Sequence, residues 1–148
     1  RVLIYPNADA GGDQIIQEIE SRSLGENTRI FRCLPRREYL GVMAAADVMV
    51  GNSSSGIIEA PSFGLPVVDV GPRQEGRERA ANTLSVPHER HEIQEAISKC
   101  LTDDSFRERA AASSNPYEYG VAGKRICEWL VEVEIDERLL RKRLAFEC

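Results

Sequence analysis

Short apolar runs alternate along this chain with segments whose apolar residues recur at helical spacing. The runs expected to form strands are VLIYP, TRIFRCL, VMVG, PVVDVG and TLSVP, at residues 2–6, 28–34, 48–51, 66–71 and 83–87. They are rich in β-branched and aromatic residues, as strands usually are. The VMVG run has no polar side chain, which predicts a strand buried on both faces, as in a parallel sheet.

The segments between these runs predict helices. Residues 13–25 place Ile15, Ile16 and Ile19 on one face, and Gly25 is expected to be the C-cap. Further helices are expected over residues 36–47, 55–64 and 89–101, and from residue 120 onward. The side chains expected to face the core are Ile93, Ala96, Ile97 and Leu101 in one helix, and Ile126, Trp129, Leu130 and Val133 in the last.

Strands that alternate with helices in this way predict βαβ units and a parallel sheet. The expected fold is therefore α/β, a Rossmann-like doubly wound parallel sheet. The 148 residues are enough for one core and few for two, so we expect a single domain over 1–148 with a helical tail from about residue 133. The first residues carry neither a methionine nor a leader pattern, which suggests a chain cut from a longer protein.

Composition narrows the classes of function. A net charge of −5 argues against a nucleic-acid binder, and no apolar run approaches the roughly 20 residues that span a bilayer. The four cysteines show no C-x-x-C spacing, so reduced thiols in a cytoplasmic protein are expected. His88 and His91 are three positions apart, but no acid or cysteine follows at ligand spacing, so no metal site is expected.

Three loops are candidates for a ligand site, because such sheets bind ligands beyond the carboxyl ends of their strands. The first loop, NADAGG, covers residues 7–12 and follows the first strand. The serine loop, GNSSSG, covers residues 51–56, and the arginine loop begins with GPRQEGRE and covers residues 71–79. All three are expected to emerge at the same edge of the sheet.

The serine loop allows three interpretations. A nucleophilic serine would require G-x-S-x-G, but position 55 is Ser55 rather than glycine and no base is evident. A helix N-cap requires one hydroxyl, whereas this loop offers Asn52, Ser53, Ser54 and Ser55 before Gly56. Several hydroxyls at a helix N-terminus favour an anion site that cradles phosphate.

The charged groups nearby agree with a phosphate ligand. Arg73, Arg77 and Arg79 lie within the arginine loop, and a guanidinium group binds phosphate in a bidentate fork. The alternative is a solvated loop with surface ion pairs. Glu59 lies one helical turn after Ser55, where a carboxylate can accept hydrogen bonds from a ribose diol or pair with an arginine.

The segment GNSSSGIIEAPSFGLPVVDVGPRQEGRERAANTLSV resembles the nucleotide-binding half of UDP-N-acetylglucosamine 2-epimerases of the hydrolysing subfamily. YPNADAGG and NPYEYGVAGKRICEWL are similar to the same family in the same order, so the resemblance extends to about Glu132. The R-Q-x-G-R-E form of residues 73–78 is closer to the hydrolysing branch than to the non-hydrolysing one. The resemblance implies the C-terminal half of a GT-B architecture, in which two Rossmann-like domains enclose a cleft.

The resemblance also implies roles for individual residues. Ser53 and Ser54 would hold the diphosphate of a UDP-sugar, Glu59 the ribose hydroxyls, and Arg73 the nucleotide near its phosphates. No cofactor is implied, and the catalytic groups would lie upstream of Arg1, in a missing N-terminal domain that is the expected partner. The isolated chain is therefore expected to be inactive, and a homo-oligomer is compatible with the sequence. The full set of expected ligand residues is Asn52, Ser53, Ser54, Ser55, Gly56, Glu59, Arg73, Gln74 and Arg77.

Two alternatives from other classes stay open at this point. The chain is also compatible with the donor-binding domain of a GT-B glycosyltransferase, although no acid-rich loop toward the hexose is evident. It is equally compatible with a non-catalytic module that binds nucleotide-sugars. A purely structural Rossmann-like domain would differ from all of these, because a uridine nucleotide would not raise its melting temperature.

Overall fold

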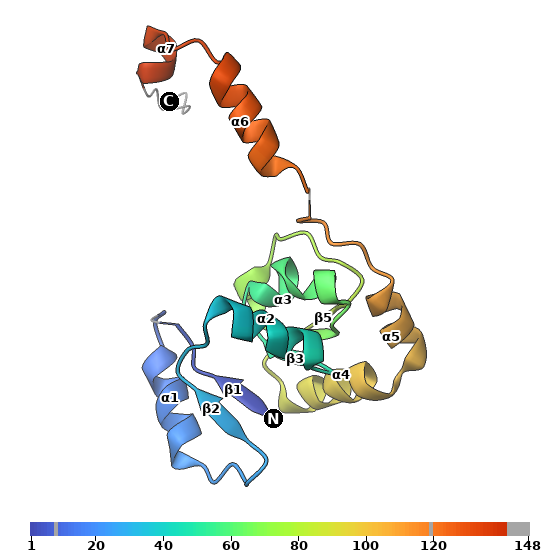
Figure 1. Cartoon of the computed structure of the whole chain (residues 1–148). Helices are drawn as coiled ribbons and strands as arrows, with labels where there is room; N and C mark the ends of the chain where they lie inside the picture. Colours follow the sequence, from blue (N-terminus) through green and yellow to red (C-terminus); the bar gives the residue numbers. More distant parts are fainter. Residues whose placement is uncertain (8, 119, 142–148) are drawn as a thin grey trace, which may run out of the picture. The chain divides into compact units, whose positions relative to one another are not determined.

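The computed structural model describes residues 1–7, 9–118 and 120–141 (Figure 1). The chain divides into two compact units, Arg1–Asn115 and Pro116–Cys148. The first unit begins with β1 (Val2–Ile4), α1 (Gly12–Ser21), β2 (Arg29–Phe31), α2 (Arg36–Ala45) and β3 (Met49–Gly51). It continues with α3 (Ser55–Ile58), the 3-10 helix η1 (Ala60–Phe63), β4 (Val67–Val70), the 3-10 helix η2 (Pro72–Gln74), β5 (Thr83–Val86), α4 (Arg90–Thr102) and α5 (Asp104–Ala111).

All described strands pair in parallel, which confirms the predicted α/β class. They form two ladders: β1 pairs with β2, and β4 lies between β3 and β5. In the second sheet Met49 lies opposite Val67, and Val67 lies opposite Thr83. β3 is thus an edge strand, and Val50 is 45% exposed, so the prediction that this run is buried on both faces is wrong.

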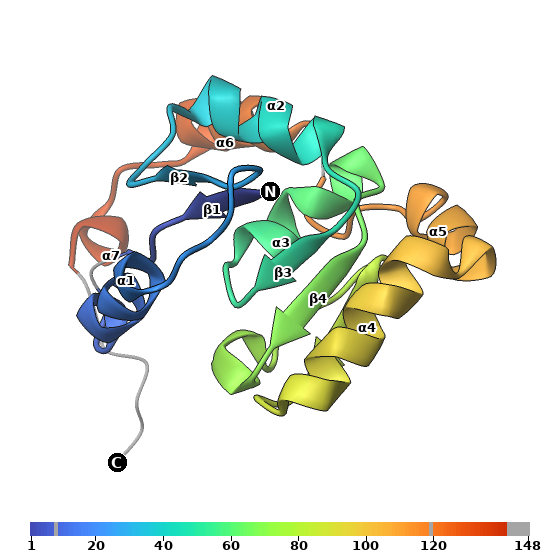
Figure 2. The same cartoon turned by 90° about the horizontal axis from the view of Figure 1, so that it is seen from below.

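Helices cover both faces of the second sheet. Successive residues of β4 point to opposite faces, so each face can be described by the residues that pack on it. Val67 packs with Met43, Ala60 and Leu65, from α2, η1 and the turn before β4. Val68 faces the other way, and Figure 2 shows α4 and α5 on that side. The residues buried with it are Ala96, Cys100 and Phe106. The core therefore lies on both sides of β4, as in a doubly wound fold.

Three details of the helices differ from the sequence predictions. α1 ends at Ser21 with Arg22 as its C-cap, and Gly25, at φ +70°, lies in the loop beyond. Leu101 is 42% exposed rather than inward, whereas Ala96 and Cys100 on the same helix are buried. α5 was not anticipated, because Asp103 both ends α4 and caps α5 by accepting a hydrogen bond from the Phe106 N–H at 3.0 Å.

The second unit contains α6 (Ala122–Glu132) and α7 (Glu137–Leu140). α6 has the predicted apolar face, but Ile126, Trp129 and Leu130 are 57 to 61% exposed. The second unit does not bury this face by itself, since two short helices offer little surface to cover it, and its place in a core stays a prediction. The expected tail beyond residue 141 lies outside the described residues. Within the described ranges, no helix is both long and apolar enough to cross a membrane.

Candidate functional site

The three candidate loops meet at one edge of the first unit, as predicted, and Arg73 joins them. Its Nη1 donates to the main-chain oxygen of Asn52 at 3.0 Å, which links the arginine loop to the serine loop. Its Nη2 lies 2.6 Å from Oδ2 of Asp9 in the first loop. The Arg73 side chain is 41% exposed, so its guanidinium group contacts two loops while the side chain stays partly open to solvent.

Gln74 strengthens the link between the serine and arginine loops. It is 2% exposed, and its Nε2 donates to the same Asn52 oxygen at 2.7 Å. Its Oε1 is buried and has no hydrogen-bond partner among the described residues. The buried Gln74 side chain therefore connects the arginine loop to the serine loop, and Asn52 takes part in this connection through its main-chain oxygen.

The first residues of the serine loop make few hydrogen bonds within the protein. The Ser53 hydroxyl accepts from the Ser55 N–H at 3.3 Å, whereas Ser54, the N-cap of α3, makes no side-chain cap. In the described part of the chain, the N–H groups of Ser53 and Ser54 donate to no protein acceptor. Since α3 has only four residues, its macrodipole is small, and an anion here would rely on hydroxyls, N–H groups and Arg73.

Gly56 has a packing role in this loop. It is buried, and a Cβ added to it would lie 2.9 Å from Cγ1 of Val67. A side chain at this position would push α3 away from β4. Gly56 thus lets the serine loop approach the sheet closely, which differs from a direct role in holding a ligand.

Glu59 lies between α3 and η1, with its side chain 24% exposed. Nη1 of Arg36, at the start of α2, is 3.4 Å from Oε1 of Glu59. This distance exceeds the usual range for a hydrogen bond, so the pair is loose. The structure therefore shows the arginine partner that was one of the two alternatives for Glu59, and the side chain stays partly exposed.

The Arg79 guanidinium is held by hydrogen bonds within the protein. Its Nη2 donates to Oδ2 of Asp69 at 3.0 Å and to the Gln74 carbonyl at 2.9 Å, and its Nη1 donates to the Arg77 carbonyl at 3.0 Å. Asp69 is 1% exposed. Asp69 was not among the residues predicted to matter, although an acid inside the apolar PVVDVG run was a signal. The Arg77 side chain is exposed, and no described interaction brings it to the serine loop.

Gly71 and His88 lie together where β4 and β5 end. Gly71 has φ +77°, and a Cβ added to it would lie 2.4 Å from Nε2 of His88. The imidazole therefore rests on the glycine at the start of the arginine loop. No three His, Cys, Asp or Glu side chains gather as metal ligands within the residues that the structure describes.

Tyr5 ties the end of β1 to α1 beside the first loop. Its hydroxyl donates to Oε1 of Glu20 at 2.9 Å. This hydrogen bond raises the pKa of the phenol above its usual value, because ionisation would place two negative charges side by side.

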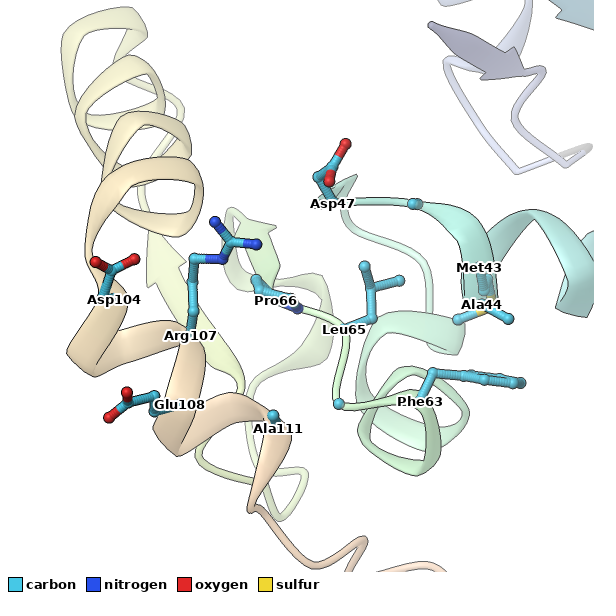
Figure 3. A pocket seen from close by; sticks show the side chains of 12 residues that line it. Met43, Ala44, Asp47, Phe63, Leu65, Pro66, Asp104, Arg107, Glu108 and Ala111 are labelled. Carbon is cyan, nitrogen blue, oxygen red and sulfur yellow. The ribbon is translucent and has the colours of Figure 1, made fainter.

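A separate hollow of about 550 Å³ lies at the amino ends of β3 and β4. Figure 3 shows its lining, with Asp47 and Pro66 just before the strands and Arg107 on the facing α5. Three carboxylates line it, and the Arg107 guanidinium donates to the Leu101 carbonyl at 3.3 Å. None of the predicted ligand residues lines it, and ligands of such sheets bind at the opposite ends of the strands. The convergent loops are therefore the stronger candidate site.

Comparison with known proteins finds similarity over most of the chain. The family model for UDP-N-acetylglucosamine 2-epimerase matches residues 1–131. A relative from Legionella pneumophila, UDP-N,N'-diacetylbacillosamine 2-epimerase (hydrolyzing), is 35% identical over 145 residues. A Campylobacter jejuni GDP/UDP-N,N'-diacetylbacillosamine 2-epimerase (hydrolyzing) is 36% identical over 110 residues, and a Neisseria meningitidis UDP-N-acetylglucosamine 2-epimerase is 34% identical over 111.

These relatives are much longer than the chain. The match covers 98% of this chain but 37% of the Legionella relative. The match with the Campylobacter relative covers 72% of this chain and 28% of the relative. The match with the Neisseria relative covers 71% of this chain and 29% of the relative. The chain thus corresponds to a little over a third, at most, of the length of these relatives.

Proposed function

The chain belongs to the UDP-N-acetylglucosamine 2-epimerase family, and we propose that it is the UDP-binding half of an enzyme that hydrolyses UDP-N-acetylglucosamine to N-acetylmannosamine and UDP. One observation carries the proposal: Arg73 and Gln74 both donate to the Asn52 main-chain oxygen, at 3.0 and 2.7 Å. This link holds a guanidinium group against the serine loop, which carries the hydroxyls of Ser53 and Ser54. A fixed cation beside hydroxyl and N–H donors suits a diphosphate.

The other end of the nucleotide would extend toward Glu59. Its half-buried carboxylate follows the serine loop by one helical turn and is held loosely by Arg36 at 3.4 Å. A carboxylate that retains free acceptor capacity can bind the two hydroxyls of a ribose. The proposed order along the ligand is therefore ribose at Glu59 and diphosphate at Ser53, Ser54 and Arg73.

In the proposed reaction a base removes the proton at C2 of the hexose. The C1–O bond breaks, its electron pair leaves with UDP, and a glycal forms. Water then adds across the double bond and its oxygen binds C1. A proton binds C2 on the face opposite to the one that lost its proton, which gives N-acetylmannosamine. Charge grows on the departing phosphate, so a fixed guanidinium and N–H donors lower the barrier to this step.

The proton-transfer groups are proposed to lie outside this chain. At this edge Asp9 pairs with Arg73, Glu59 with Arg36 and Asp69 with Arg79. These acids are engaged with arginines rather than set as an acid–base couple. We expect the 148-residue chain to release no N-acetylmannosamine by itself and to do so when an N-terminal Rossmann-like half is supplied. Turnover by the chain alone, abolished by a single acid substitution in it, would contradict this division.

Nucleotide selectivity tests the binding assignment. UDP should bind the chain more tightly than AMP or NADH, with a Kd on the order of millimolar because half of the cleft is absent. Titration calorimetry with each nucleotide measures the difference. Equal affinity for the three, or no binding of UDP, would contradict the proposal.

Two substitutions separate phosphate binding from ribose binding. Arg73→Lys keeps the charge but removes the planar fork, so UDP binding should weaken by roughly 1–2 kcal/mol. Arg22→Lys, in an exposed ion pair at the C-terminal end of α1, is the matched control and should leave UDP binding unchanged. Glu59→Gln should weaken UDP binding more than binding of 2′-deoxy-UDP. An equal loss for both ligands would show that Glu59 is structural.

A further inference from the structure

The ion pair between Asp9 and Arg73 places a carboxylate at the proposed phosphate site. Oδ2 of Asp9 is 2.6 Å from Nη2 of Arg73, while Nη1 of the same guanidinium donates to Asn52. The Asp9 side chain is 58% exposed, so it shares the open face of the arginine. A ligand phosphate that reaches Arg73 would therefore lie close to the negative charge of the Asp9 carboxylate.

This arrangement recurs at the other end of the site. Among the described residues, the ion pairs that join the elements around β1 and β2 to those around β3, β4 and β5 are Asp9–Arg73 and Arg36–Glu59. Each ends on a residue predicted to bind the nucleotide. The segments that follow β1 and β2 thus supply counter-charges to Arg73 and Glu59, the predicted ligand residues that follow β4 and β3.

The charge of the nucleotide changes during the proposed reaction. The diphosphate of a UDP-sugar is esterified at both ends and carries two negative charges. Free UDP ends in a phosphate whose last proton has a pKa of about 6, so near neutral pH it carries most of a third charge. A carboxylate beside the phosphates repels this additional charge.

We propose that Asp9 is a specificity-determining residue that disfavours free UDP relative to the UDP-sugar at Arg73 and thereby promotes product release. This inference rests on the proposed function, since it assumes that Arg73 meets the diphosphate. Asp9 contributes charge at the phosphate and takes no part in proton transfer. Its pairing with Arg73 also gives the emptied guanidinium a partner when UDP leaves.

The test compares two ligands in two variants of the 148-residue chain. Calorimetry gives the Kd for UDP and for UDP-N-acetylglucosamine at pH 7.5 and low salt. Asp9→Asn should tighten UDP more than the UDP-sugar, so that the preference for UDP rises about two- to fivefold, the scale of an exposed ion pair. In concentrated salt of about 1 M, where the Debye length falls to about 3 Å, this difference should shrink.

Asp13→Asn is the matched control. This substitution removes the same charge four positions away, in the first turn of α1. Asp13 has no hydrogen-bond or ion-pair partner for its side chain among the described residues. The substitution should leave the ratio of the two Kd values unchanged. An unchanged ratio in Asp9→Asn, or weaker binding of UDP, overturns the inference, because Asp9 would then serve only to hold Arg73. If the unmodified chain binds neither ligand, the proposed function fails and the inference with it.

Discussion

The two sheets of the first unit differ in how deeply they are buried. In β4, Val67 and Val68 are 2% and 0% exposed, whereas in the first sheet Val2, Ile30 and Phe31 are 37 to 44% exposed. The buried sheet carries the serine and arginine loops, and the exposed sheet carries the loops that supply their counter-ions. The groups expected to position a ligand thus stand on the part of the unit with the larger core, where local opening costs most.

The two phenylalanines give the largest expected contrast. Phe106, in α5, is 1% exposed against the second sheet, and Phe31, in β2, is 37% exposed. Phe106→Ala should lower the free energy of unfolding by about 3–5 kcal/mol, because it removes a buried ring and leaves a cavity. Phe31→Ala should cost about 1 kcal/mol or less. Urea unfolding followed by circular dichroism measures both, and similar losses would break the comparison.

Removal of an arginine from each of two ion pairs sharpens the contrast. Arg79→Met leaves the Asp69 carboxylate, 1% exposed, without its cation, so the free energy of unfolding should fall by about 2–4 kcal/mol. Arg36→Met breaks an exposed pair and should cost about 1 kcal/mol or less. Denaturant titration of the two variants at the same pH is the measurement. A larger loss for Arg36→Met would show that the exposed pair is the stronger support.

Two glycines separate backbone strain from helix propensity. Gly71→Ala forces φ +77° on an alanine whose Cβ meets His88, so stability should fall by about 1–3 kcal/mol. Gly41 lies within α2 with open space around it, so Gly41→Ala should raise stability by about 0.5–1 kcal/mol. Thermal melts of both variants check the opposite signs. His88→Ala should rescue Gly71→Ala only in part, since the backbone strain persists.

Two cysteines report the same contrast through labelling and the pH dependence of stability. Cys33, just beyond β2, is exposed, whereas Cys100 is buried in α4, and burial raises the pKa of its thiol from 9.0 to about 11. Between these values the unfolded thiol loses its proton while the folded one keeps it, so stability should decline as pH rises from about 9 to 11. At pH 8, iodoacetamide should label Cys33 readily and Cys100 only in denaturant, as mass spectrometry would reveal.

Much of the fold was accessible from local patterns. The apolar runs and the helical spacing differ in period, so the alternation of strands and helices and the parallel α/β class could be predicted and are confirmed. The meeting of the three loops at one edge followed from the polarity of parallel strands. Helix α5 was missed because it follows α4 without a turn segment, and Asp103 serves both helices.

The ion pairs of the site had no comparable signal. Arg73 and Asp9 are 64 positions apart, and Arg36 and Glu59 are 23 apart. The arginine loop alone holds three arginines and two acids, and no spacing rule decides which of its arginines meets Asp9. The apolar face of α6 was predicted from its period, but periodicity indicates a face without telling what covers it. The roles of the predicted ligand residues stay predictions.

The shared oxygen of Asn52 has a consequence for how sequences of this kind can vary. Arg73 and Gln74 both donate to a main-chain atom, which every amino acid at position 52 would provide. Substitutions at that position therefore retain the acceptor, provided that the backbone of the loop keeps its conformation. Among the three residues of this junction, a single codon change removes a hydrogen-bonding group only at Arg73 or Gln74, so the direct mutational vulnerability of the contact lies with its donors.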